Sequence, residues 1–383
     1  MTEDLQLIFF AAIALIVAMV VSFISTPVVK TFAQKVGAMD VPKDNRRMHK
    51  VPIPRLGGLA IFFGFLVAVL IFVDITPQFK GMMAGAIIIV ILGIIDDIMP
   101  LPALLKFVVQ IIASLVAIWG GNVINVISNP NILSDQPYIN LGIFAIPITV
   151  FWIVAITNSV NLIDGLDGLA VGVSTISSLT ILVIALVVSE GETALLMAAL
   201  AGGCIGFLPY NLNPAKIFMG DTGATFLGFV LAVVSIQGLF KFYAVISFAV
   251  PFLILGLPIF DTAFAFLRRL AKGQNPMSPD RSHVHHRLID MGLNQKQTVA
   301  ILYVISAILG LSAVILTTSG AAKAIILFVT LCIVAVISTQ LIFSHTNGKA
   351  ENLPGEKEKK NEPPEKAKTK ENSPLPEEQK PEE

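Results

Sequence analysis

Five aspartates stand beside long apolar stretches, where a charged side chain needs a reason to be present. They lie in three segments, GIIDDIMP (Asp96, Asp97), NSVNLIDGLDGLA (Asp164, Asp167) and NPAKIFMGDTG (Asp221). A charge in the middle of a bilayer costs about 2.5–3.5 kcal/mol even on a lenient insertion scale. Hard divalent cations such as Mg²⁺ take carboxylate oxygens, often only one or two together with the phosphates of a substrate. The aspartates therefore indicate a cation site that holds a phosphorylated substrate, provided that the three segments converge.

Each segment taken singly also has a simpler structural explanation. A pair of aspartates is common at a helix end, where the charges remain solvated. The NxxDGxDG segment is compatible with a polar turn, in which the glycines let the backbone reverse and point both aspartates toward one mouth. Its spacing is not that of an EF-hand calcium loop. GDTG lacks the Gly-Lys-Ser/Thr ending of a Walker phosphate loop, so it is a weak signal by itself.

A basic cluster follows later in the chain. The run PDRSHVHHRL contains Arg281, His283, His285, His286 and Arg287. No cysteine or carboxylate accompanies the histidines at the spacing of a structural zinc site. The cluster favours a phosphate or sugar-nucleotide ligand, although a basic loop on anionic lipid headgroups explains it equally well. Asp261, within an apolar run, is equally compatible with a structural ion pair and with a functional role.

These residues are carried by a chain too apolar to be an ordinary soluble domain. Of its 383 residues, 55% are hydrophobic and 14% are charged, so polar side chains are too few to cover an apolar core. About 20 apolar residues span a bilayer as a helix. The sequence predicts an all-α polytopic membrane protein with about eleven transmembrane helices at 5–29, 56–73, 81–95, 101–119, 144–160, 170–189, 194–210, 222–240, 243–266, 298–318 and 324–343.

Basic residues orient these helices, because cytoplasmic connections carry an excess of Lys and Arg. Seven basic residues lie between the first and second stretches and six between the ninth and tenth. The connections on the other side hold only Lys80, Lys241 and Lys323. This asymmetry predicts an N-terminus outside the cell and a C-terminus in the cytoplasm. The five aspartates, which played no part in the assignment, then fall at the cytoplasmic face, where we expect the active site.

The end of the chain differs in composition from the rest. Residues 344–383 are rich in Lys, Glu and Pro, which predicts a disordered charged cytoplasmic tail after a transmembrane catalytic domain at 1–343. Cys204 and Cys332 each lie in an apolar run, so no disulfide framework is expected. Lys and Arg (26) balance Asp and Glu (26), which indicates no nucleic-acid partner. The partners that remain are membrane lipids and the substrates.

Five segments occur in order between about residues 40 and 295: RRMHKVPIPRLGG, GIIDD, NSVNLIDGLDGLA, NPAKIFMGDTGATFLG and PDRSHVHHRL. Together they resemble the motifs of the polyprenyl-phosphate N-acetylhexosamine-1-phosphate transferase superfamily (glycosyltransferase family 4). Val284 interrupts the run of three histidines that is typical of the pentapeptide transferase branch. The chain therefore looks more like the bacterial undecaprenyl-phosphate N-acetylglucosamine-1-phosphate transferases, and the eleventh stretch and inward tail favour the same branch.

The resemblance implies a reaction and its partners. N-acetylglucosamine-1-phosphate would pass from UDP-N-acetylglucosamine to undecaprenyl phosphate, giving undecaprenyl-diphospho-N-acetylglucosamine and UMP. Mg²⁺ is the implied cofactor, with Mn²⁺ as a substitute. The implied location is the bacterial plasma membrane, and a homodimer is compatible with the family. The product would begin a cell-envelope glycan, such as a teichoic acid linkage unit or O-antigen.

The resemblance also assigns roles to individual residues. The implied metal ligands are Asp221, Asn161, Asp97 and Asp96, and the implied catalytic aspartates are Asp96, Asp97, Asp164 and Asp167. The sugar nucleotide would contact Asn158, Asp164, Asp167, Arg281, His283, His285 and His286, and the lipid phosphate would contact Lys50 and Arg55. Lys106 receives no role. Direct attack by the acceptor is preferred over covalent catalysis by Asp96, because a phosphate monoester with a second pKa of roughly 6 is already mostly dianionic at neutral pH.

Three other functions compete with this one. A pentapeptide transferase of the same superfamily would differ in the UDP-sugar that releases UMP. An ion-coupled transporter would carry acidic residues along mid-span positions, and only Asp261 meets that description. A scaffold that binds partners through its tail would leave the membrane motifs unexplained.

Overall fold

The computed structural model of the chain describes residues 2–42, 51–128, 138–238, 249–273, 283–319, 323 and 329. The chain divides into two units, Met1–Val329 and Thr330–Glu383. The second unit, which holds the predicted charged tail and most of the predicted eleventh stretch, lies outside the described residues. The described helices and strands all belong to the first unit.

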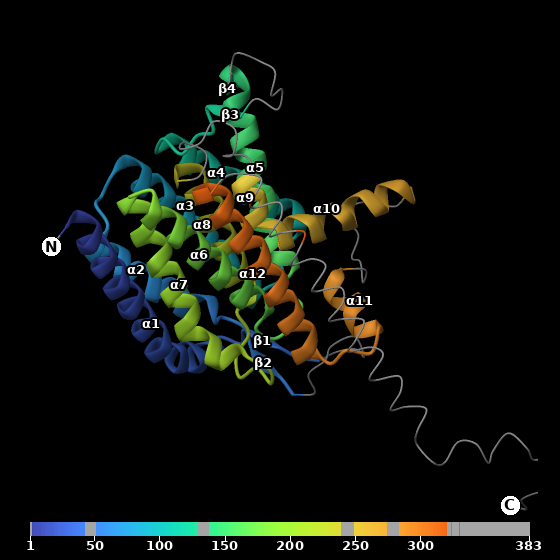
Figure 1. The fold of residues 1–383 in the computed structure, drawn as a ribbon. Helices are drawn as coiled ribbons and strands as arrows, with labels where there is room; N and C mark the ends of the chain where they lie inside the picture. Colours follow the sequence, from blue (N-terminus) through green and yellow to red (C-terminus); the bar gives the residue numbers. More distant parts are fainter. Residues whose placement is uncertain are drawn as a thin grey trace, which may run out of the picture. The chain divides into compact units, whose positions relative to one another are not determined.

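The first unit is a bundle of helices, several of which run side by side along its length (Figure 1). The helices are α1 (Glu3–Lys35), α2 (Gly58–Phe72), α3 (Pro77–Ile98), α4 (Ala103–Trp119), α5 (Ala145–Leu162), α6 (Leu169–Val187), α7 (Gly191–Asn211), α8 (Gly220–Gly238), α9 (Ala249–Ile254), α10 (Gly256–Ala271), α11 (Val284–Asp290) and α12 (Gln295–Ser319). One 3-10 turn, Gly142–Phe144, precedes α5.

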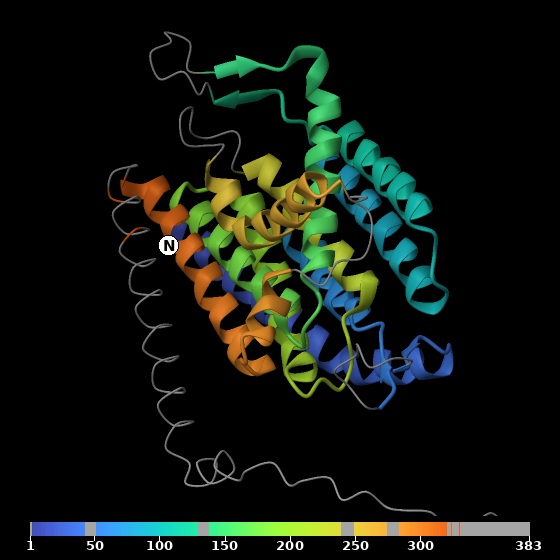
Figure 2. The same cartoon turned by 90° about the vertical axis from the view of Figure 1, so that its right-hand side faces the viewer.

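Two short antiparallel hairpins lie at opposite ends of the bundle (Figures 1 and 2). Strand β1 (Met39–Asp40) pairs with β2 (Ile53–Pro54) at one end. Strand β3 (Val126–Ser128) pairs with β4 (Tyr138–Asn140) at the other end, beside the start of α5. The β1–β2 hairpin is the one that contributes to the site described below.

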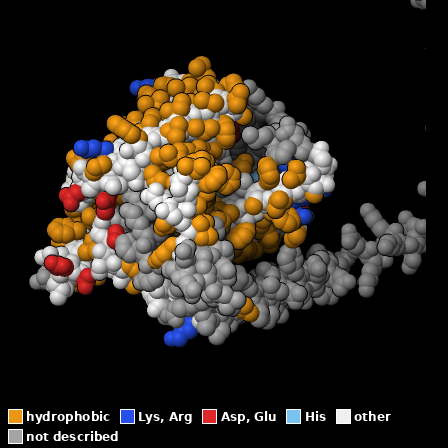
Figure 3. Space-filling model, turned by 90° about the horizontal axis from the view of Figure 1, so that it is seen from above, with side chains coloured by type: hydrophobic (Ala, Val, Ile, Leu, Met, Phe, Trp, Pro, Cys, Tyr) orange, Lys and Arg blue, Asp and Glu red, His pale blue; other side chains and the backbone are white. Residues whose placement is uncertain are grey.

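The length and composition of the helices are those of a polytopic membrane protein. Within the described residues, seven helical segments are long and apolar enough to cross a bilayer, and α2 and α4 are shorter apolar helices. Large apolar side chains remain exposed on many helices, and they cover much of the face shown in Figure 3. The predicted all-α membrane architecture is therefore confirmed in its main feature. The count of eleven spans and their orientation stay predictions.

The predicted ninth stretch, 243–266, is not one continuous helix. Residues 243–248 lie outside the described residues, and the rest is divided at Leu255 into α9 and α10. Pro258 has no N–H to donate to the carbonyl of Ile254 four residues earlier, and its ring would clash with that carbonyl in a continuous helix. The freed carbonyl of Ile254 instead accepts a hydrogen bond from Oγ of Ser177 on α6 (3.0 Å). Beyond the break, α10 runs out to the side of the bundle (Figure 1).

Helix α8 lies in the core of the bundle, between α3, α5 and α2. Its side chains are almost all buried, and Phe226 and Phe229 are fully enclosed. A helix that is buried on every side holds its first residue in a fixed place, because packed interiors resist small displacements. That first turn, which contains Asp221, is where the candidate site begins.

Candidate active site

A carboxylate from α3 holds the first turn of α8. Oδ1 of Asp97 accepts a hydrogen bond from the backbone N–H of Asp221 (3.0 Å). Its Oδ2 accepts two from Thr222, one from the backbone N–H (3.0 Å) and one from Oγ1–H (2.7 Å). The first N–H groups of a helix have no partner inside the helix. Asp97 therefore caps α8 from a neighbouring helix and fixes the place of Asp221.

Glycine is required just before this cap. Gly220 has φ of 73°, a left-handed conformation that costs other residues roughly 1–2 kcal/mol. A Cβ at this position would also collide with the carboxylate of Asp97. The glycine of GDTG thus allows α3 and α8 to meet through the aspartate, and not through a phosphate loop.

Arg55 brings a positive charge to the same place. Its Nη2 lies 3.2 Å from Oδ1 of Asp97 and 3.8 Å from Oδ1 of Asp221. The backbone around it is fixed to the segment before α8: the N–H of Phe218 donates to Pro54 (2.8 Å), and the N–H of Gly57 donates to Phe218 (2.9 Å). The Arg55 side chain is 29% exposed and lines the cavity described below, so it is available to a ligand.

Lys106 of α4 supplies a second cation. Its Nζ lies 2.9 Å from Oδ2 of Asp96 and 3.0 Å from Oδ2 of Asp221. Oδ1 of Asp96 accepts a hydrogen bond from the backbone N–H of Leu101 (2.7 Å), which ties the end of α3 to the loop before α4. Lys106 therefore holds two carboxylates from different helices around one ammonium group.

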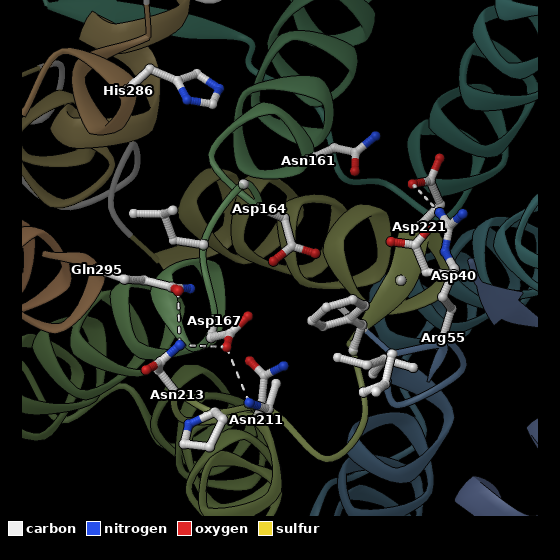
Figure 4. A pocket seen from close by; sticks show the side chains of 18 of the residues that line it. Asp40, Arg55, Asn161, Asp164, Asp167, Asn211, Asn213, Asp221, His286 and Gln295 are labelled. Atoms are coloured by element: carbon white, nitrogen blue, oxygen red, sulfur yellow. Dashed lines mark hydrogen bonds and ion pairs between the residues drawn. The ribbon is translucent and has the colours of Figure 1, made fainter. Parts of the chain in front are cut away.

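A cavity of about 730 Å³ opens beside these charged groups. It lies where the loops after α5 and α7, the β1–β2 hairpin and the start of α12 come together (Figure 4). Its polar lining consists of Asp40, Arg55, Lys106, Asn161, Asp164, Asp167, Asn211, Asn213, Asp221, His286 and Gln295. The volume is within the usual range for small-molecule sites, about 300–1,000 Å³.

Asp164 lies near the middle of the lining, between Asp167 and Asp221 in the view of Figure 4. Burial, with the charges of Asp221 and Asp97 added, raises the pKa of Asp164 to about 7. Within the described part of the chain, its carboxylate accepts no hydrogen bond and forms no ion pair. A buried carboxylate in this state is a group that a bound cation would stabilise.

Another part of the cavity lining joins the carboxylate of Asp167 to side-chain amides. Oδ2 of Asp167 accepts hydrogen bonds from Nδ2 of Asn213 (2.9 Å) and from the backbone N–H of Ala215 (3.0 Å). Nδ2 of Asn213 also donates to Oε1 of Gln295 at the start of α12 (2.7 Å). Asn211 joins the same loops, because its Oδ1 accepts from the N–H of Gly168 (3.1 Å). This part of the lining offers neutral amides and one carboxylate, and it does not include Arg55 or Lys106.

The histidine run forms the beginning of α11. His283 and His285 are buried, at 6% and 2% exposure, and only His286 lines the cavity. The ring of His285 packs against Gly165 so closely that a Cβ there would overlap it. Burial, together with neighbouring His286, lowers the pKa of His285 to about 4. His285 is therefore neutral near pH 7 and serves as packing behind the cavity wall.

The lining carries oxygen atoms of the kind that a hard divalent cation binds. Within the described ranges, no cluster of three or more His, Cys, Asp or Glu side chains has the geometry of a metal site. Mg²⁺ needs fewer protein ligands than that, because it keeps waters and takes substrate phosphates. Asp221, Asp164 and Asn161 line one cavity with oxygen atoms, so this donor set fits such an ion.

The structure places the predicted site residues in three groups. Those that line the cavity are Asp221, Asn161, Asp164, Asp167, His286 and Arg55. Asp96 and Asp97 lie directly behind Asp221, His283 and His285 lie behind His286, and Asn158 of α5 pairs with Gln110 of α4 (Nδ2 to Oε1, 2.6 Å). Lys50 and Arg281 lie outside the described residues.

Five residues of the lining were assigned no role from the sequence: Asp40, Lys106, Asn211, Asn213 and Gln295. A signal was present for the asparagines, since NLNPAK is a polar segment directly before the GDTG motif. Lys106 lies on α4, and nothing in its neighbourhood in the sequence shows that it reaches Asp221. Its role follows only from the packing of α4 beside α3.

Comparison with known proteins was consistent along most of the chain. Residues 79–239 match the family described as glycosyl transferase family 4. The chain is 44% identical over 310 residues to a probable undecaprenyl-phosphate N-acetylglucosaminyl 1-phosphate transferase of Bacillus subtilis, which covers 80% of this chain and 85% of that protein.

Two further relatives are more distant but also extensive. An undecaprenyl-phosphate alpha-N-acetylglucosaminyl 1-phosphate transferase of Thermotoga maritima is 33% identical over 333 residues, 86% of this chain and 97% of that protein. A decaprenyl-phosphate N-acetylglucosaminephosphotransferase of Mycolicibacterium smegmatis is 34% identical over 330 residues, 77% of this chain and 79% of that protein.

Proposed function

The chain belongs to glycosyl transferase family 4, and we propose that it transfers N-acetylglucosamine-1-phosphate from UDP-N-acetylglucosamine to undecaprenyl phosphate. The products are undecaprenyl-diphospho-N-acetylglucosamine and UMP. The names of the relatives support a polyprenyl-phosphate acceptor and an N-acetylglucosamine-phosphate group as what is transferred. The observation that carries the proposal is the cavity in which Arg55, Lys106, Asp164 and Asp221 meet at the ends of apolar helices.

The reaction joins two anionic phosphates, so charge neutralisation and alignment are its main requirements. An oxygen of the acceptor phosphate bonds to the β-phosphorus of the UDP-sugar, the bond to the bridging oxygen breaks, and UMP leaves with that oxygen. We assign Arg55 to the acceptor phosphate, because its guanidinium is partly exposed at the cavity. The ammonium group of Lys106 pairs with the carboxylates of Asp96 and Asp221, so its positive charge lowers their repulsion of the incoming anions.

The cation that we assign to this site is Mg²⁺, or Mn²⁺, with Asp221, Asp164 and Asn161 as its protein ligands. Such an ion, when bound, neutralises charge on the transferring phosphates. The metal role predicted for Asp96 and Asp97 stays a prediction. In the structure, the oxygens of both residues make hydrogen bonds to other protein groups. Asp97 caps α8, and Asp96 is engaged by Lys106 and Leu101.

Direct attack by the acceptor needs no protein nucleophile. A phosphate monoester has a second pKa of roughly 6, so the acceptor is mostly dianionic at neutral pH. Asp96 does not line the cavity, and its two oxygens are hydrogen-bonded. This geometry supports direct displacement over a covalent intermediate on Asp96. Trapping a phosphorylated Asp96 with sugar nucleotide alone would contradict it.

The remaining parts of the proposal concern the membrane. We place the protein in the bacterial plasma membrane with eleven spans, the N-terminus outside, and the cavity and the 344–383 tail in the cytoplasm. A cytosolic sugar nucleotide then reaches the cavity directly, while the acceptor chain stays among the helices and lipids. The product is the first lipid-linked intermediate of a cell-envelope glycan.

The test is an assay of purified protein with undecaprenyl phosphate, Mg²⁺ and a panel of radiolabelled UDP-sugars. We expect UMP release and a labelled lipid with UDP-N-acetylglucosamine only, and neither when the lipid or the cation is omitted. Release of UMP from UDP-N-acetylmuramoyl-pentapeptide instead would place the chain in the pentapeptide branch. Transport of a solute without UMP release would favour the transporter.

A further inference from the structure

We propose that Asp261 of α10 is a positioning residue for the histidine segment 283–286. The inference rests on the proposed function and on the role that the family resemblance implies for this segment, which is contact with the sugar nucleotide. Asp261 does not line the cavity, so it has no direct contact to offer a substrate there. Its effect passes through the histidines.

Both oxygens of Asp261 are used to hold the start of α11. Oδ2 lies 2.9 Å from Nδ1 of His283, and Oδ1 accepts a hydrogen bond from the backbone N–H of Val284 (2.8 Å). A carboxylate can only accept, so Nδ1 of His283 carries the proton in this pair. His283 is the residue that precedes α11, and Val284 is its first residue. Asp261 thus caps α11 from another helix, as Asp97 caps α8.

A continuous line of contacts runs from this cap to the cavity. The rings of His283 and His285 are stacked, with centroids 5.8 Å apart and planes 8° from parallel. The rings of His285 and His286 are 4.3 Å apart, and His286 lines the cavity. Because His285 also packs against Gly165 of the NxxDGxDG loop, a rotation of α11 would displace both the histidine and the loop beside Asp164.

The cost of burying Asp261 argues that its contacts matter. The residue is 5% exposed and its partner His283 is 6% exposed. Removing one partner of a buried hydrogen bond to a carboxylate is destabilising, because the other partner stays buried without compensation. A second contact joins the same two helices, since the guanidinium of Arg287 lies 6.0 Å from the ring centroid of Phe264. Helix α10 therefore contacts α11 through the carboxylate of Asp261 and through the ring of Phe264.

The experiment compares D261A and D261N with D290A as the matched control. Asp290 is an exposed carboxylate at the far end of α11, so D290A removes the same group without touching the cap. Asn at 261 keeps an oxygen for the N–H of Val284 and an amide that can donate to Nδ1 of His283. Turnover is measured against each substrate separately, and hydrogen exchange of the 284–290 amides is measured by mass spectrometry.

We expect D261A to raise KM for UDP-N-acetylglucosamine about tenfold, with a smaller change in kcat and no change in KM for undecaprenyl phosphate. The 284–290 amides should exchange at least about tenfold faster in D261A, because the cap is lost. In D261N, KM for UDP-N-acetylglucosamine and the exchange rate of the 284–290 amides should lie within about threefold of the wild type. In D290A, both quantities should equal those of the wild type. Should D261A not accumulate in the membrane, D261S, which lacks the second acceptor oxygen, carries the same test.

Wild-type exchange and a wild-type KM for the sugar nucleotide in D261A or D261S would overturn the proposal. So would a loss confined to kcat, or an equal loss in D290A. A wild-type protein that releases no UMP from any UDP-sugar would instead overturn the proposed function. The exchange measurement would still decide whether Asp261 holds α11, so the two failures are distinguishable.

Discussion

The carboxylate of Asp97 on α3 accepts hydrogen bonds from both the backbone N–H and the hydroxyl of Thr222 on α8, at 3.0 and 2.7 Å. These residues are 125 positions apart in the sequence. Through this contact the DD motif and the GDTG motif form one structural element, in which the first motif fixes the first turn that carries Asp221. The position of Asp221, which lines the cavity, therefore depends on Asp97, which does not.

The first prediction concerns this cap. D97A should lower the unfolding free energy by about 3 kcal/mol, because two buried N–H donors lose their acceptor. Turnover should fall at least about a hundredfold, since a small displacement of a positioned group costs this much. T222V removes only the hydroxyl contact and should cost about 1 kcal/mol.

Thermal unfolding in detergent and UMP release check both variants. T225V is the control, because the hydroxyl of Thr225 donates to the carbonyl of Asp221 within α8 (2.6 Å) and, among the described residues, makes no hydrogen bond to Asp97. Near-normal turnover in D97A would remove this aspartate from the site.

A second prediction uses glycine. G220A should abolish turnover and lower stability by more than about 2 kcal/mol, because the added Cβ meets Asp97 and also strains the left-handed backbone. G37A is the matched control: Gly37 has φ of 76°, and nothing lies within 4 Å of a Cβ placed there. It should lose only about 1–2 kcal/mol. Equal losses of stability in the two variants would show that strain alone accounts for the effect.

Hydropathy predicted the positions of most helices because an apolar stretch in a membrane chain has few other conformations open to it. The predicted stretch 81–95, for example, falls within α3. The break in the ninth stretch was missed, although Pro258 was visible in the sequence. Its cost depends on whether another group satisfies the carbonyl of Ile254, and the hydroxyl of Ser177 that does so lies on a helix about eighty residues earlier.

The aspartates and histidines could be singled out from residue type and motif order, but their partners could not. Lys106 is ten residues from Asp96, and its contact with Asp221 arises only when α4 packs on α3. Asp261 was left between a structural and a functional role, and its contacts with His283 and Val284 become visible only in the folded chain. Contacts of this kind depend on helix packing and register, which local sequence patterns do not specify.

The third prediction concerns cation binding. D221N and N161A should each weaken binding of Mn²⁺ at least about tenfold, because each removes an oxygen ligand that faces the cavity. Electron paramagnetic resonance of free Mn²⁺ during a titration measures this without turnover. D290N, which changes an exposed carboxylate on α11, should bind Mn²⁺ like the wild type. Unchanged binding in D221N would contradict the assigned ligand set.

The fourth prediction is a pH dependence set by Asp164. Burial and the charges of Asp221 and Asp97 raise the pKa of this carboxyl to about 7, against an ordinary value of 3.8. Between these two values the folded protein holds a proton that the unfolded chain has lost, so the cation-free protein should lose stability as pH rises from about 4 to about 7. A cation bound by Asp164 must displace that proton below pH 7.

The apparent Kd for Mn²⁺ should therefore rise about tenfold for each pH unit below 7 and stay level above it, since one proton is released for each ion bound. D164N has no proton to lose at this position, so its weaker affinity should depend less steeply on pH between 5.5 and 7 than that of the wild type. The same substitution should flatten the pH dependence of thermal unfolding in chelator-treated protein. A wild-type Kd that is independent of pH in this window would show that Asp164 is already ionised without the cation, or that it is no ligand, and either result would remove it from the cation site.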